Sequence, residues 1–200
     1  MWEIILAAGW PIWPLIFASV IALAIIGERF WSLRLDVVAP SELLPEVQKL
    51  LTQGAIKKDV IAKIRDHSLL GQIFASALVN SNSSAAHLKE AIEESGRAVS
   101  YKLEKYLSTL GTIAAVAPLL GLLGTVIGMV DLFGSFTNSG HDVGVFARGI
   151  SVALYNTATG IIVAVPAMIF YRYFRSRVED LIFDMEQQAL KLVDSMGVRK

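Results

Sequence analysis

The sequence has no cysteine and carries little charge, and both absences narrow what the protein can be. Without cysteine the chain forms no disulfide, no Cys-ligated zinc site, no iron–sulfur cluster and no thiol nucleophile. Only 18% of the residues are charged, 54% are hydrophobic, and the mean hydropathy is +0.55. A formal net charge of +0 gives no excess of Lys and Arg for the phosphates of a nucleic acid. The composition therefore indicates a membrane protein.

Three apolar stretches are long enough to cross about 30 Å of hydrocarbon, which takes about 20 helical residues. They lie between Glu3 and Glu28, between Lys105 and Asp131, and between Arg148 and Arg172. The first begins with an acidic segment and has no small-residue cleavage site before its flanking charges. We interpret it as a span that is kept, and not as a signal peptide.

The basic residues beside the spans predict the orientation. They are Arg29 and Arg34 after the first span, Lys102 and Lys105 before the second, and Arg172, Arg175 and Arg177 after the third. Both the amino terminus and the loop between the second and third spans are then outside, and the carboxyl terminus is inside. We expect a first transmembrane helix in 1–33, an inner helical domain in 34–105, a second transmembrane helix in 106–133, an outer loop in 134–146, a third transmembrane helix in 147–171 and an inner helix in 172–200.

Apolar residues at helical spacing predict long helices on the inner side. One stripe consists of Leu88, Ile92, Val99, Leu103, Tyr106 and Leu110, follows a plausible N-cap at Ser84, and leads into the second span without a proline. It predicts one helix of about 45 residues and about 70 Å. A second stripe, Phe174, Val178, Leu181, Met185 and Leu192, predicts that the third span extends inward and packs on this chain and on a neighbouring copy.

Small residues mark the faces on which spans pack, because helices in lipid associate through close contact. In the second span they are Gly121, Gly124 and Gly128, the last two forming a G-x-x-x-G, and in the third span they include Ala153 and Gly160. Small-residue spacing alone is moderately specific for packing and says almost nothing about function. Pro118 and Pro166 each remove a backbone hydrogen bond inside a span, which predicts kinked helices packed on protein.

The polar residues inside the spans carry no charge. Thr125, Thr157 and Thr159 could simply hydrogen-bond to backbone carbonyls, whereas Asn156 needs a partner or water because a bare amide in hydrocarbon is costly. Proton-moving membrane proteins usually place Asp, Glu, His or Lys at membrane depth, and these spans have none. His141 and Asp142, in the outer loop, fit solvated turn residues better than ligands. Any membrane acid must therefore come from a partner.

Three segments resemble a known family. "VAPLLGLLGTVIGMV" and "ISVALYNTATGIIVAVPA" are similar to the second- and third-span patterns of the MotA/TolQ/ExbB proton channel family, and "GWPIWPLIFASVIALAIIGERFW" resembles the first span of its ExbB-type members. The resemblance implies an all-α protein of three transmembrane helices with long cytoplasmic extensions, assembling as a ring of five copies. It would lie in a bacterial inner membrane with a periplasmic amino terminus and a cytoplasmic carboxyl terminus.

The resemblance also implies partners. Five copies would surround a dimer of ExbD-type single-span helices whose Asp carries the proton, and a TonB-type transducer would pass the work to outer-membrane receptors. By motif, Thr125 and Thr157 would face the partner and the proton path with Asn156 beside them, and Pro118 and Gly121 would shape the same wall. Many members have a Glu five residues before the third-span Thr, where this chain has Val152.

Three functions stay open from the sequence. The first is an ExbB-type energy-transducing subunit, the second is a TolQ-type subunit acting with TolR and TolA, and the third is a structural membrane scaffold. An enzyme is the least favoured, because no nucleophile–base pair, metal-ligand cluster or phosphate-binding loop is present in the sequence. We expect no cofactor and no metal, with protons as the coupling ion.

Overall fold

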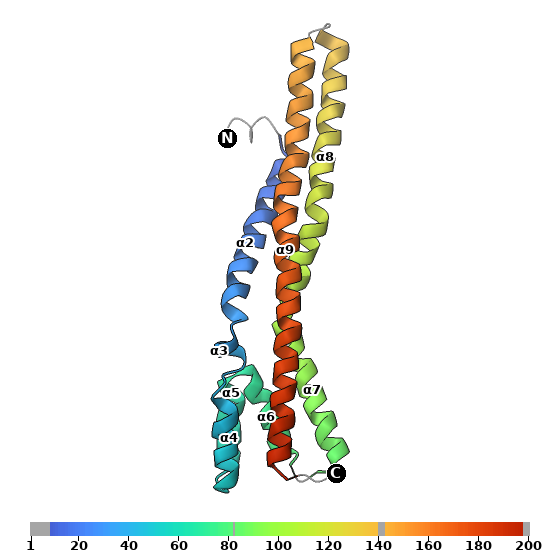
Figure 1. Ribbon diagram of the computed structural model, residues 1–200. Coiled ribbons are helices and arrows are strands. Elements are labelled where there is room, and N and C mark those ends of the chain that lie inside the picture. Colours follow the sequence, from blue (N-terminus) through green and yellow to red (C-terminus); the bar gives the residue numbers. More distant parts are fainter. Residues whose placement is uncertain (1–8, 82, 140–142, 198–200) are drawn as a thin grey trace. The chain divides into compact units, whose positions relative to one another are not determined.

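The computed structural model describes residues 9–81, 83–139 and 143–197, and in this part of the chain every regular element is a helix (Figure 1). The helices are α2 (Ile12–Ser32), α3 (Leu35–Val38), α4 (Leu43–Thr52), α5 (Lys58–His67), α6 (Leu69–Val79), α7 (Ala85–Leu103), α8 (Leu107–Ser139) and α9 (Val143–Ser195). Segments of α2, α8 and α9 are long and apolar enough to cross a membrane: Ile12–Ser32, Leu107–Gly134 and Gly149–Ser195. The all-helical class and the three apolar helices are as the sequence predicts.

The chain forms two compact units. One contains the described residues up to Glu28 together with Tyr106–Tyr173, and we call it the membrane unit. The other contains Arg29–Lys105 and the described residues from Phe174 onward, and we call it the helical unit. α9 belongs to both units because it is one helix of 53 residues, as the spacing of its second half predicts.

In the membrane unit, α2 packs on α8 and α9 through one small cluster. Leu15 is fully buried with Ala117 of α8 and Ala164 of α9, and Leu120 and Val163 pack against them. The small alanine side chains of α8 and α9 let α2 approach both helices closely. Close packing of this kind holds helices together in a membrane, because lipid tails are as apolar as the side chains. This contact positions α2 beside the α8–α9 pair.

The helical unit is built on the second half of α9. All five residues of the predicted stripe are buried, from Phe174 to Leu192, and Ala189 is the buried residue of the intervening turn. Phe174 also meets the Phe30 ring edge to face, with ring centroids 5.1 Å apart. The stripe is therefore an internal core of this chain. Its packing on a neighbouring copy stays a prediction.

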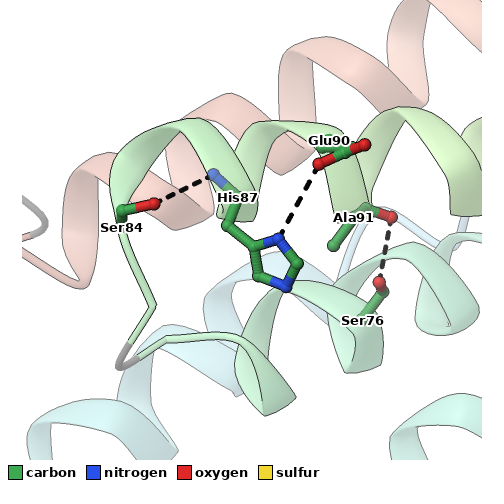
Figure 2. Close-up of polar contacts among 5 residues, drawn as sticks. All are labelled: Ser76, Ser84, His87, Glu90 and Ala91. Carbon is green, nitrogen blue, oxygen red and sulfur yellow. Dashed lines mark hydrogen bonds and ion pairs between the residues drawn. The ribbon is translucent and has the colours of Figure 1, made fainter.

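Polar contacts cap the start of α7 and join α7 to α6 (Figure 2). The Ser84 hydroxyl accepts a hydrogen bond from the His87 backbone N–H at 3.3 Å, so the predicted N-cap is confirmed. The Ser76 hydroxyl donates to the Ala91 carbonyl at 3.0 Å, which joins α6 to α7. The first half of α7 is thereby held against α6.

The prediction of one helix from the inner domain through the second span is wrong. α7 ends at Leu103, α8 begins at Leu107, and Tyr106 between them has a φ of 64°, in the left-handed region. The buried Arg29 guanidinium donates to the Leu103 carbonyl at 3.0 Å. In a continuous helix that carbonyl would accept from the amide four residues later, so the arginine bond replaces a helical one at the break.

The left-handed backbone at Tyr106 generates a test of this break. Asn tolerates a positive φ, whereas a β-branched residue is strongly disfavoured there. We expect Tyr106→Val to destabilise the protein by about 1–2 kcal/mol relative to Tyr106→Asn. The measurement is thermal unfolding of the two variants in detergent, where both lack the phenol ring and differ in backbone preference. Equal midpoints would contradict a left-handed residue at this position.

Candidate functional site

The candidate site lies where α8 and α9 come closest, in the membrane unit. A Cβ added at Gly121 would lie 2.7 Å from the Asn156 carbonyl oxygen and 3.0 Å from the Thr157 Cα. A Cβ added at Gly160 would lie 2.6 Å from the Ala117 carbonyl oxygen. Real Cβ atoms do not approach backbone so closely, so these two positions bring the helices together only as glycine.

Two further small residues extend the contact. The space a side chain would take at Gly124 is filled by Asn156, whose Cβ would be 2.7 Å from the added carbon, and Asn156 is only 1% exposed. Gly128 faces Ala153, with a separation of 3.2 Å between the added carbon and the alanine Cβ. The sequence-predicted packing residues of both spans thus meet along one interface.

This close approach brings together the hydroxyls of Thr125 and Thr157, which hydrogen-bond to each other across the interface. The Thr125 Oγ1 also lies 3.2 Å from the Ala153 carbonyl oxygen and 3.3 Å from that of Gly121. The Thr157 Oγ1 lies 3.3 Å from the same Gly121 oxygen. Both side chains are half-buried. The two threonines named by the motifs are therefore one polar unit supplied by two helices.

The other serine and threonine of the third span, Ser151 and Thr159, bond within their own helix. The Thr159 hydroxyl donates to the Tyr155 carbonyl at 2.8 Å, and the Ser151 hydroxyl donates to the Ala147 carbonyl at 3.0 Å. Such bonds to the carbonyl four residues back satisfy an isolated hydroxyl in an apolar helix. These residues need no partner helix, which separates them from the Thr125–Thr157 pair.

The two prolines lie inside α8 and α9, as predicted. Pro118 is half-buried, one turn from Gly121, whereas Pro166 is exposed in the chain, so the expected protein packing around it is not found within the described residues. His141 and Asp142 lie outside the described residues.

Sequence reasoning missed two close contacts at the ends of the interface. The Leu132 side chain occupies the space beside Gly149, and the Tyr171 ring lies 3.1 Å from a carbon added at Gly111. The large residue that meets each glycine could be named only once the register of the two helices was known. The same holds for the buried Arg29, which the sequence marked only as a charge that sets orientation.

The geometry defines a class of protein: a helical membrane protein with three spans whose second and third spans enclose an uncharged hydroxyl pair. Residues 65–187 match the model of the MotA/TolQ/ExbB proton channel family. The chain is 33% identical over 179 residues to a Synechocystis sp. protein named ExbB-like 3, covering 86% of this chain and 83% of that one. The chain therefore belongs to the MotA/TolQ/ExbB proton channel family.

Other relatives carry the names of two different systems. Biopolymer transport protein exbB1 of Vibrio cholerae is 26% identical over 167 residues, which cover 80% of this chain and 72% of that protein. Tol-Pal system protein TolQ of Pseudomonas aeruginosa is 42% identical over 82 residues, which cover 40% of this chain and 36% of that protein. The match to TolQ has the higher identity but is short, and the match to exbB1 is long but has the lower identity. An experiment is therefore needed to separate the two systems.

The backbone approach at Gly160 predicts a severe effect of a single methyl group. We expect Gly160→Ala to destabilise the α8–α9 pair by about 1–3 kcal/mol, because the added carbon meets a carbonyl that cannot move without the helix. Gly27→Ala is the matched control, since an added carbon there meets nothing within 4 Å. Thermal unfolding in detergent checks both variants. An unchanged midpoint for Gly160→Ala would contradict the close approach.

Proposed function

We propose that the protein is the channel and stator subunit of an inner-membrane complex that uses the proton motive force to energise TonB-dependent transport across the outer membrane. Its partners in this proposal are further copies of itself in a ring of five, an ExbD-type single-span subunit and a TonB-type transducer. The single observation that carries the proposal is the pair of threonine hydroxyls enclosed by the second and third spans.

The hydrogen-bond capacity of the pair supports this role. Each hydroxyl has one proton to donate and two lone pairs with which to accept. When one hydroxyl donates to the other and the second donates to a carbonyl, three of the four lone pairs remain open. The Gly121 and Ala153 carbonyls can only accept, so one of them takes the remaining proton and both leave these lone pairs unfilled. A half-buried pair of this kind can accept a hydrogen bond from water or from a protonated acid.

The acid itself must come from elsewhere. No Asp, Glu, His, Lys or Arg occurs in 107–130 or in 149–171, so this chain has no titratable carboxylate or imidazole in the apolar part of either helix. A carboxylic acid on a single-span partner would supply the missing proton carrier, and the threonine pair would hold it or a water beside the path. The family to which the chain belongs is a proton channel family, which fits this division of roles.

Two alternatives have their own support. The similarity to TolQ favours an equivalent role with TolR and TolA, in which the same site would drive envelope constriction. A purely structural scaffold would use the threonine pair only to pack α8 on α9, and the bonds from Thr125 to the Ala153 carbonyl and from Thr157 to the Gly121 carbonyl would serve that packing.

The deciding experiment is proton-dependent uptake of an iron–siderophore complex in cells whose only ExbB-type subunit is this protein. We expect Thr157→Val to reduce uptake at least about tenfold, because valine keeps the shape and removes the hydroxyl. Thr157→Ser restores a hydroxyl and should recover much of the activity. Thr159→Val is the matched control and should retain uptake, because that hydroxyl bonds only its own helix among the described residues.

Co-purification of the single-span partner is measured on the same variants. Lost uptake with the partner still bound supports the proton-path role, whereas normal uptake by Thr157→Val would refute it and leave a packing role. Cells lacking TolQ, complemented with the same chain and scored for envelope constriction, separate the two systems.

A further inference from the structure

We propose that a groove between the start of α7 and the end of α9 binds the cytoplasmic segment of the single-span partner, through one or two apolar side chains flanked by Lys or Arg. The inference rests on the proposed function, because the partner is taken from it. The groove lies wholly within the helical unit and is separate from the threonine pair.

The groove has an apolar floor that no described residue fills. Its volume is about 350 Å³, and its apolar lining includes Leu88 and Ile92 of α7 with Leu190 and Val193 of α9. Leu190 is 53% exposed although it lies on a helix whose adjacent stripe is completely buried. The space suits one or two large apolar side chains, which would bury area that is now exposed to water.

The rim of the groove is acidic. Lys89 and Glu93 form an ion pair at 3.7 Å, so their charges offset each other. Glu186 and Asp194 also line the groove, and neither forms an ion pair with a described residue. Among the described residues nothing offsets these two negative charges of the rim, which favour a cationic segment and disfavour anionic lipid headgroups.

A basic cytoplasmic segment is expected of the partner by general rule. A protein with one span has one end in the cytoplasm, and short cytoplasmic segments within about 15–20 residues of a span are enriched in Lys and Arg. Phe174 is the first residue of α9 in the helical unit, and Leu190 lies about 24 Å farther along the helix at 1.5 Å per residue. About eight extended residues cover that distance, so a short terminal segment can reach the groove.

The absence of cysteine makes a direct test possible, since Leu190→Cys places the only thiol of this chain at the groove. The chain is purified in complex with the single-span partner, which carries one cysteine in its cytoplasmic segment, and disulfide formation is measured. Tyr101→Cys is the matched control, because Tyr101 is an exposed aromatic residue of α7 that does not line the groove. We expect crosslinking at Leu190→Cys to be at least about tenfold faster than at Tyr101→Cys, a difference of about 1.4 kcal/mol.

Charge reversal tests the rim in the same complex. We expect Glu186→Lys with Asp194→Lys to slow the crosslink about tenfold. Asp180→Lys with Asp184→Lys, which reverses two exposed charges of α9 outside the groove, should leave the rate unchanged. A rate unaffected by the first double substitution, or equally slowed by the second, would overturn the proposal.

Other occupants give different products. A disulfide between two copies of this chain as the main product would assign the groove to a second copy. A rate that rises about tenfold when residues 198–200 are deleted would assign it to the basic end of this chain, and either result overturns the proposal. A wild-type chain that retains no single-span partner is instead a failure of the proposed function. In that case the groove is tested by the binding of a fluorescent peptide that has one Leu–Phe pair between Lys pairs. Its binding is compared with that of a peptide with Glu in place of Lys, and equal binding of the two overturns the proposal.

Discussion

The site depends on the contact of α8 and α9 backbones at Gly121 and Gly160. At these positions a methyl group would lie 2.6–2.7 Å from a carbonyl oxygen of the opposite helix, so only glycine permits the separation that the structure has. The threonine hydroxyls meet because the helices are that close. A larger residue would move the helices apart, and each hydroxyl would then turn to its own backbone, as Thr159 does. Gly121 and Gly160 therefore determine both how closely α8 packs on α9 and whether the two threonine hydroxyls meet.

Much of the fold follows from the sequence because its strongest signals are local. Apolar length predicts three spans, and four-then-three spacing predicts the buried stripe of α9 from Phe174 to Leu192. The small residues of both spans predict that these faces pack. Which residue meets which could not be read from the sequence, because it depends on the register of two helices about 30 residues apart in the chain. The pairing of Gly124 with Asn156 is one such contact.

The break between α7 and α8 shows why local periodicity can mislead. Tyr106 keeps the spacing of the stripe, and no Gly or Pro marks an end, so the pattern favours a continuous helix. The structure instead ends α7 at Leu103, whose carbonyl receives the Arg29 guanidinium. A cation at a helix carboxyl end is favourable, and a buried cation needs an acceptor, so one distant side chain outweighs the local preference. Such a contact between residues 29 and 103 has no local signature.

By the resemblance, Val152 stands where many members of the family have a Glu, and the same geometry places this position on α9. Val152 precedes Thr157 by five residues, which on a helix of 3.6 residues per turn is a rotation of about 140°. It therefore lies on a different side of α9 from the hydroxyl that contacts Thr125. A carboxylate at this position could not share the Thr125–Thr157 bond without a change in helix rotation. Valine at this position leaves the threonine pair intact, and the proposed proton path then depends on the acid of a partner helix.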